Sequence, residues 1–282
     1  MFIISTVDEM LNMLSNLTMQ SKQVTKDIIL LQFTVANACI VASTNLKTRD
    51  EWVLVDTGLT NSADFIVKTA EEFYGRNARP SAVILTHGHF DHVGSAIELA
   101  AKWEVPVYAH SLELPYLIGK KDYPLADPTV DEGMIAKISP AFPHHSIDLG
   151  YHAVELPKDG SVPGLPNWKW VHTPGHTEGH ICLFKEKDRI LIAADALTTV
   201  KQESLISVLF QKEHISGPPK YLTTDWKAAE ESVRKIHDLK PSLIIPSHGQ
   251  PMKGEELSRH LDLLVNNFKE MAVPEHGRYV DR

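Results

Sequence analysis

The amino-acid sequence predicts an α/β protein with two packed β-sheets. Its 282 residues suffice for one large domain, and 43% of them are hydrophobic. Apolar runs typical of strands form two groups along the chain, with segments of helical spacing between and around them. Because no internal repeat, low-complexity tract or linker interrupts this order, we expect a single domain over residues 1–282.

The first group of predicted elements begins at residue 27, where the core of the domain is expected to start. Short runs of β-branched and aliphatic residues predict strands at 27–33, 38–43, 51–58, 81–87 and 105–110. Apolar residues three and four positions apart predict helices at 62–75 and 94–103. The stretch 111–166 is rich in Pro, Gly and Asp, so we expect an insertion of loops and short helices there.

The second group of predicted elements follows this insertion, and the core of the domain is expected to end at about residue 255. Apolar runs predict strands at 168–175, 180–186, 189–195 and 241–249. Helical spacing predicts helices at 225–239 and, closing the chain, at 254–272. Asp225 directly precedes the first of these helices and is expected to be its N-cap.

Composition limits the partners and the compartment. The formal charge of −8 and the absence of a Lys/Arg run argue against nucleic acid. No apolar run is long enough to span a membrane, and Asp8 and Glu9 interrupt the apolar start, so no signal peptide is expected. Cys39 and Cys182 lie in strand-like stretches and are expected to be buried free thiols. We therefore expect a cytoplasmic protein that acts on a small molecule.

The stretch LTHGHFDHVG, residues 85–94, concentrates metal-ligand chemistry. It follows a predicted buried strand, and loops at the carboxyl ends of strands are where α/β sheets tend to build their sites. His87 and His89 are two positions apart and share a face in an extended loop, while a turn at Asp91 and His92 can aim a second pair at a neighbouring point. Imidazole and carboxylate groups suit Zn²⁺, Fe²⁺ or Mn²⁺, so this loop predicts part of a two-metal site.

One loop cannot complete a metal shell, and further ligand types stand at other strand ends. His176 follows a predicted strand in HTPGHTEGH, Asp195 ends the apolar run ILIAAD, and His248 ends LIIPSHG. A carboxylate that closes a buried strand is costly unless it is paired or metal-bound. This cost favours a ligand role for Asp195.

The motifs THGHFDHVG, TPGHTEGH, AAD and PSHG, preceded by VLVDTG, resemble those of the metallo-β-lactamase superfamily in the same order. The resemblance covers roughly residues 27–255 and implies a four-layer αββα sandwich with its site at one edge between the sheets. It implies a first metal held by His87, His89 and His176, and a second held by Asp91, His92 and His248. Asp195 would bridge the two ions together with a hydroxide, and Asp56 would support the ligands.

The resemblance implies a hydrolase in which the bridging hydroxide attacks a small ester, lactone or thioester, with zinc as the expected metal and iron or manganese as alternatives. Asp91 would also orient the hydroxide or carry a proton to the leaving group. The alternative is an oxidoreductase like the persulfide dioxygenases of the same fold, which hold one iron. A protein that kept the fold and lost its chemistry is disfavoured, because all seven ligand positions are filled.

Branches of the superfamily differ in features that this sequence shows. Antibiotic-hydrolysing members are usually exported and lack the bridging Asp, so resistance is not expected. Glyoxalase II-like thioesterases carry a glutathione-binding C-terminal domain, which the 34 residues after His248 do not provide. Acyl-homoserine lactonases place a tyrosine where this chain has Thr198. The nearest expectation is therefore a member of the glyoxalase II-like or lactonase-like branch without that C-terminal domain.

The segment 197–224 directly follows Asp195 and is expected to shape substrate choice, with a plain connecting helix as the alternative. Its candidate substrate contacts are Gln211, His214 and Tyr221. The other histidines are expected to lie in strands, in helices or at the surface and not to bind metal. In particular, His180 is expected to be a packed or supporting residue, and the pair His144 and His145, which no carboxylate pattern accompanies, is expected to lie at the surface.

Overall fold

The computed structural model describes residues 19–44, 51–200 and 215–280. Gln211, His214 and the amino-terminal residues 1–18, on which some expectations rest, lie outside these ranges. Contacts divide the chain into two compact units, Met1–Tyr123 with Pro143–Asn167 and Pro124–Phe142 with Trp168–Arg282. The expectation of a single domain stays a prediction.

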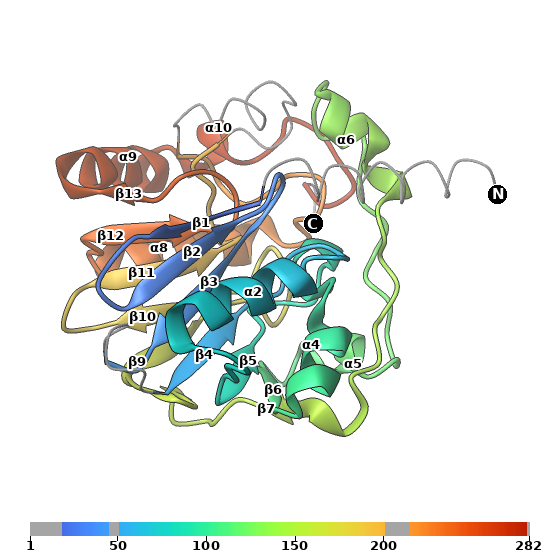
Figure 1. The fold of residues 1–282 in the computed structure, drawn as a ribbon. Helices are drawn as coiled ribbons and strands as arrows, with labels where there is room; N and C mark the ends of the chain where they lie inside the picture. Colours follow the sequence, from blue (N-terminus) through green and yellow to red (C-terminus); the bar gives the residue numbers. More distant parts are fainter. Residues whose placement is uncertain (1–18, 45–50, 201–214, 281–282) are drawn as a thin grey trace. The chain divides into compact units, whose positions relative to one another are not determined.

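The first unit contains a seven-stranded mixed sheet (Figure 1). Its strands pair in chain order: β1 (Gln20–Gln23), β2 (Ile28–Gln32), β3 (Asn37–Ala42), β4 (Trp52–Val55), β5 (Ala82–Ile84), β6 (Val107–Ala109) and β7 (Ala153–Glu155). The first three pairings are antiparallel and the last three are parallel. All residues of the central strands β2, β3 and β4 are buried, which explains their unbroken apolar runs.

Helices α2 (Ala63–Tyr74) and α4 (Ala96–Trp103) cover one face of this sheet (Figure 1). Ile66 of α2 and Leu99 of α4 are fully buried in the same apolar cluster as alternate residues of the strands, such as Ile40 and Leu54. This packing fixes the carboxyl ends of β4 and β5, from which the ligand loop and its supporting residues leave. A short helix, α3 (Phe90–Val93), forms the end of that loop, and a second short helix, α5 (Leu114–Leu117), follows β6.

The second sheet has the order β13-β12-β11-β10-β9-β8 and is also mixed. Its strands are β8 (Ser161–Val162), β9 (Leu165–His172), β10 (Ile181–Lys185), β11 (Ile190–Ala194), β12 (Leu243–Pro246) and β13 (Met252–Lys253). Neighbours pair antiparallel along β9-β10-β11 and β12-β13, whereas β11 and β12 run parallel. The carboxyl ends of β11 and β12 therefore lie at one edge.

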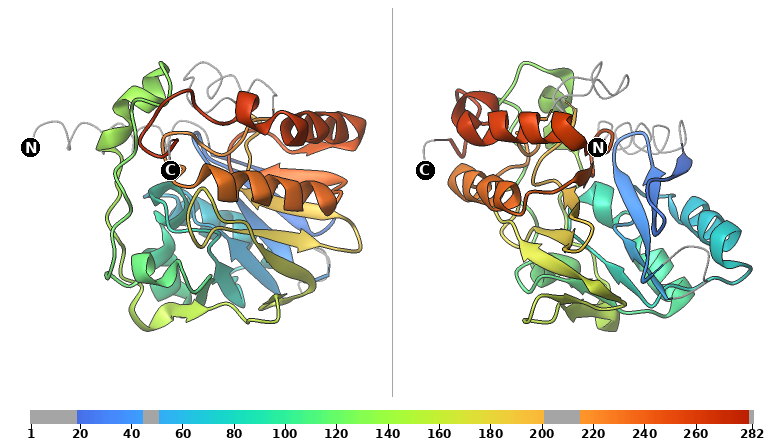
Figure 2. Two further views of the ribbon diagram at one scale, coloured as in Figure 1. Left: turned by 180° about the vertical axis from the view of Figure 1, so that it is seen from behind. Right: turned by 90° about the vertical axis from the view of Figure 1, so that its left-hand side faces the viewer.

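In the second unit, α8 (Trp226–Asp238) and α9 (Gly254–Asn266) lie side by side and share an apolar cluster with β10, β11 and β12 (Figure 2). Val233 and Leu257 are among its fully buried members. Asp225 caps α8 by accepting a hydrogen bond of 2.9 Å from the Ala228 amide, as predicted. Mixed sheets and covering helices in both units confirm the predicted α/β class.

Several boundaries differ from the expectations. The predicted closing helix 254–272 is interrupted at Asn267, which has φ −130° and ψ 35°, and resumes as α10 (Phe268–Met271). The segment 111–166 is not only loops and short helices, because it also contains β7, β8 and the start of β9. Strand β1 was missed because its four residues are all polar and exposed, so no alternation marks it.

Among the residues that the structure describes, no helix combines the length and apolar character needed to cross a bilayer.

Candidate metal centre

In the first unit, the ligand loop leaves the carboxyl end of β5, and its histidines and aspartate are buried. His87 and His92 are fully buried, and His89 and Asp91 are 5% exposed. The helix that follows begins at Phe90 rather than near Val93 as expected, so Asp91 and His92 lie in the first turns of α3. Burial of so many polar groups is costly unless their charges and hydrogen bonds are satisfied locally.

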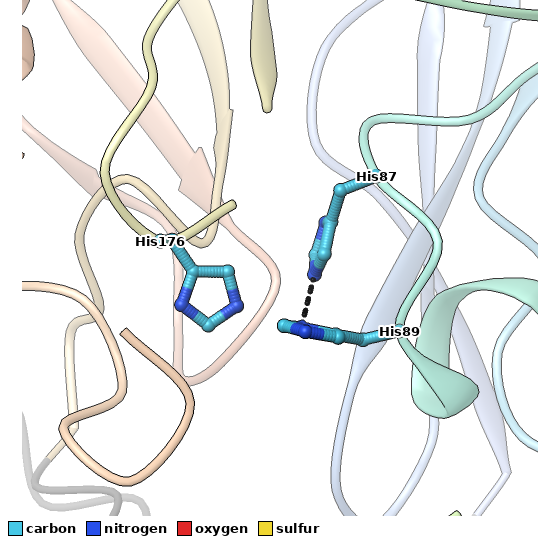
Figure 3. Close-up of side chains that lie close together, drawn as sticks. All are labelled: His87, His89 and His176. Atoms are coloured by element: carbon cyan, nitrogen blue, oxygen red, sulfur yellow. Dashed lines mark hydrogen bonds between the residues drawn. The ribbon is translucent and has the colours of Figure 1, made fainter. Parts of the chain in front are cut away.

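The side chains of this loop converge. Nε2 of His87 lies 3.0 Å from Nδ1 of His89 (Figure 3), and the ring centroids of His87 and His92 are 4.0 Å apart. Nε2 of His92 lies 3.8 Å from Oδ1 of Asp91. The first unit thus gathers three imidazoles and a carboxylate in one buried place, as the motif predicted.

Asp56, at the end of β4, orients the ligand loop through hydrogen bonds. Its Oδ1 accepts from the Thr86 amide at 2.8 Å, and its Oδ2 accepts from Nδ1 of His92 at 2.9 Å and from the Thr86 hydroxyl at 2.8 Å. The Thr86 oxygen lies 3.1 Å from Nδ1 of His87 and, because its proton goes to Asp56, it accepts there. Both histidines therefore carry the proton on Nδ1 and present the lone pair of Nε2.

The second unit places two imidazoles against one carboxylate. Oδ2 of Asp195 lies 3.2 Å from Nε2 of His176, and Oδ1 lies 3.2 Å from Nε2 of His248. The three side chains are at most 2% exposed. They leave from three segments that are far apart in the sequence, and their side chains lie close together in this unit.

A threonine also sets the tautomer in the second unit. The hydroxyl of Thr223 donates to the Pro219 carbonyl at 2.8 Å, so its oxygen accepts from Nδ1 of His176 at 3.2 Å. Nε2 of His176 then faces the Asp195 carboxylate with a lone pair. Two such acceptors repel each other unless positive charge is added, by a second proton on the ring or by a metal ion.

His180 supports Asp195, as predicted, and is fully buried. Its Nε2 accepts from the Asp195 amide at 3.0 Å, so its proton is on Nδ1, which donates to the Thr173 carbonyl at 3.2 Å. Thr86 precedes the histidine motif directly, but Thr223 lies 47 residues after its partner, and no sequence signal marked it. Both threonines were missed.

A cavity of about 350 Å³ lies beside the ligand loop within the first unit. Its walls include Gly88 of the loop and Tyr123, and several apolar side chains complete them: Leu59, Phe90, Val93, Ile97 and Ile147. His144 and His145 also line it. A mainly apolar cavity of this size fits a small organic ligand.

The remaining predicted residues have mixed outcomes. His145 is 74% exposed, as expected of a surface residue, and its Nδ1 lies 3.0 Å from Oδ2 of Asp122, a partner that the sequence pattern did not indicate. The Ser146 backbone amide and this imidazole lower the pKa of Asp122 to about 2. Tyr221 is buried, with its ring centroid 5.9 Å from that of Phe142, and its role in substrate binding stays a prediction. Thr198 forms an isolated antiparallel β-bridge with Ser216. Residues 201–214 lie outside the described residues, so the expectation that 197–224 shapes substrate choice stays a prediction.

Comparisons with known proteins agree with these motifs. A family model described as the metallo-beta-lactamase superfamily matches residues 36–248. The probable metallo-hydrolase YflN of Bacillus subtilis (strain 168) is 48% identical over 217 residues, which cover 77% of this chain and 82% of that protein. The probable metallo-hydrolase YybB of the same organism is 29% identical over 216 residues, covering 76% and 84%.

Solved structures show the same fold. The BLEG-1 B3 metallo-beta-lactamase has a TM-score of 0.57 and 23% identity, with 81% of this chain and 94% of that chain covered. TTHA1623, solved in a di-iron-bound form, has a TM-score of 0.52 and 23% identity, with 81% and 91% covered. The histidine and aspartate clusters of the two units have the donor chemistry for divalent metals.

Proposed function

The chain belongs to the metallo-β-lactamase superfamily, with the fold that its motifs predicted, and from this premise we propose that it is a metal-dependent hydrolase with two divalent ions. The observation that carries the proposal is the set of seven buried His and Asp side chains, in which Asp56, Thr86 and Thr223 fix the tautomers of three histidines. Such tautomer control by outer partners is typical of metal-binding histidines.

In the proposed centre, the two units each contribute ligands. His87, His89 and His176 would hold the first ion, and Asp91, His92 and His248 would hold the second. Asp195 would be a ligand to both ions. The family model spans all seven positions, which supports joining the two clusters into one centre.

Each residue of the chain has a stated task in this proposal. When bound, the two ions supply an activated water and a Lewis acid for the substrate carbonyl. Asp91 orients the attacking water and passes its proton to the leaving group. Asp56 keeps His87 and His92 in the tautomer that offers Nε2, and His180 holds the backbone of Asp195. No serine or cysteine nucleophile is required.

The proposed substrate is a small ester, lactone or thioester. The cavity beside the ligand loop supports this class, because its mainly apolar walls suit the uncharged part of such a molecule. The formal charge of −8 disfavours a polyanionic substrate such as nucleic acid. Zinc is the first candidate for the metal, with iron or manganese as alternatives.

A metal analysis combined with a substrate panel tests the proposal. We expect about two zinc ions per chain and hydrolysis of at least one lactone, ester or thioester, which a chelator abolishes and added zinc restores. Phosphodiesters in the same panel should not react. One iron per chain with oxygen consumption on a persulfide would contradict the hydrolase and favour the dioxygenase alternative.

A further inference from the structure

A buried carboxylate and a phenol lie directly beside the ligand loop in the first unit. Glu113 is fully buried just before α5, and Tyr123 is 6% exposed. The Tyr123 hydroxyl donates a hydrogen bond to Oε2 of Glu113. A buried carboxylate is costly to keep, so its presence here calls for a partner that needs it.

That partner is the peptide between two predicted metal ligands. The Gly88 amide lies 3.1 Å from Oε2 of Glu113 and 3.0 Å from the Tyr123 hydroxyl oxygen, and it donates to both. Gly88 separates His87 from His89, so the pair binds the backbone at the centre of the motif. A charge-assisted hydrogen bond of this kind is stronger than one between neutral groups.

The same pair restricts the loop sterically. A Cβ atom at Gly88 would lie 2.7 Å from the Tyr123 hydroxyl oxygen and 3.2 Å from Cδ2 of Leu117. The Tyr123 ring lies 4.5 Å from the His89 ring and stacks on Tyr116 at 3.9 Å between centroids. The peptide and the second imidazole are thus held from one side by one tyrosine.

We propose that Glu113 and Tyr123 are positioning residues that clamp the Gly88 peptide, so that Nε2 of His87 and Nδ1 of His89 face one ion. This inference rests on the proposed metal centre and adds two residues that the metal motifs do not contain. The hydrogen bonds of the clamp act through the two ligand histidines and do not themselves bind the ion. A purely structural role would lower stability and leave metal affinity unchanged.

Zinc affinity measures the clamp without any substrate. Tyr123→Phe removes only the hydroxyl, and we expect it to weaken zinc binding about 10- to 100-fold in competition with a chromophoric chelator. Glu113→Gln keeps an acceptor but loses the charge, so its loss should be smaller. Tyr151→Phe, at an 86% exposed tyrosine of the same unit, is the matched control and should bind zinc like the unmodified chain.

A double-mutant cycle tests whether the hydroxyl and the glycine act together. Gly88→Ala should weaken zinc binding about tenfold in the unmodified chain, because the new Cβ meets the Tyr123 hydroxyl. In the Tyr123→Phe background the added loss should be clearly smaller, since that oxygen is gone. Additive losses, or unchanged zinc affinity in folded Tyr123→Phe, would overturn the inference.

Hydrogen exchange of the Gly88 amide in the metal-free protein separates this inference from the proposed function. We expect Tyr123→Phe to accelerate exchange at Gly88 at least about tenfold while the amides of β2 and β3 keep their protection. Unchanged exchange at Gly88 overturns the clamp even if the chain binds zinc. Conversely, a chain that binds no divalent metal defeats the proposed function, and the exchange result alone then decides the clamp.

Discussion

The two units supply their ligands in different ways. In the first unit, four ligand side chains stand within six consecutive residues, from His87 to His92, and one short loop positions them all. In the second unit, His176, Asp195 and His248 come from three separate segments, and Asp195 contacts both histidines. The first cluster depends on local backbone, whereas the second depends on how β10, β11 and β12 pair.

The two clusters nevertheless share one hydrogen-bonding arrangement. A threonine hydroxyl accepts from Nδ1 of a histidine in each unit, Thr86 for His87 and Thr223 for His176. The carboxylate regions also share left-handed backbone: Asp56 has φ 59°, and Ala194, directly before Asp195, has φ 47°. Such backbone is uncommon outside glycine and is concentrated at functional sites. The two units thus differ in the chain segments that supply the candidate ligand side chains, and they resemble each other in the hydrogen bonds that orient these side chains.

The largest expected effect comes from removing a ligand from either unit. Asp195→Ala and His89→Ala should each lower kcat/KM by about 10³-fold or more, because each deletes part of the metal shell. Activity on the best substrate of the panel, metal content and circular dichroism check this, with the fold retained. His276→Ala, at an exposed histidine outside both clusters and outside the cavity lining, should be close to silent. Near-full activity in either ligand variant would contradict the assigned centre.

Variants of the residues that orient the candidate ligands should have a smaller effect on zinc affinity, and the effect should differ between the two clusters. Asp56→Asn tolerates the left-handed backbone but loses the charge that orients His87 and His92, so we expect zinc affinity to fall about 100-fold. Thr223→Val affects His176 alone, and we expect a loss of about tenfold. Chelator competition measures both. The reverse order would show that the second unit controls metal binding more strongly.

The thiols provide a pH-dependent comparison. Burial raises the pKa of Cys182 in the second unit from 9.0 to about 12, and burial, followed by the Asp56 charge, raises that of Cys39 in the first unit further. Because the folded pKa is raised, each thiol contributes stability below pH 9.0, which is lost as the pH rises. Cys182→Ala should remove about 1.4 kcal/mol per pH unit of this loss between pH 9 and 11. Urea unfolding of both proteins across this range measures it; equal slopes would contradict a buried, neutral thiol.

The smallest expected effect separates stability of the second unit from its metal cluster. Asp225→Ala removes the N-cap of α8 and should lower the free energy of unfolding by about 1 kcal/mol. Zinc affinity should stay unchanged, because no predicted ligand contacts this cap. Urea unfolding and chelator competition check the two parts. A weakened zinc site in this variant would show that α8 transmits strain to the ligands.

Most strands and helices could be predicted, because their buried faces leave a clear apolar pattern. Local signals also marked the loop 87–92 and the N-cap at Asp225. Elements without such a pattern were missed: β1 is polar, β13 has two residues, and the break at Asn267 has no Gly or Pro. These features depend on partners elsewhere in the unit rather than on their own residues.

The site was predictable to the extent that its residues carry a motif. The candidate ligands of the second unit were marked by their places at predicted strand ends, and only the resemblance joined them into one site, since His176 and His248 are 72 positions apart and no spacing rule joins them. Thr223, Glu113 and Tyr123 could not be found, because hydroxyl and carboxylate groups at irregular spacing look like ordinary surface residues. Only the fold shows that Glu113 and Tyr123 bind the Gly88 amide.

The irregular pairing between β11 and β12 has a consequence for how this protein tolerates change. Ile192 pairs with Ile245 and Ala194 with Pro246, so Ala193 is one extra residue on β11. Leu191 and Ala193 point into the helix-covered cluster, and regular alternation would send Asp195 the same way. The extra residue turns the carboxylate toward the histidines instead. Deleting a single alanine here would restore regular pairing and draw the carboxylate one position back along β11, away from the strand ends where the histidines stand.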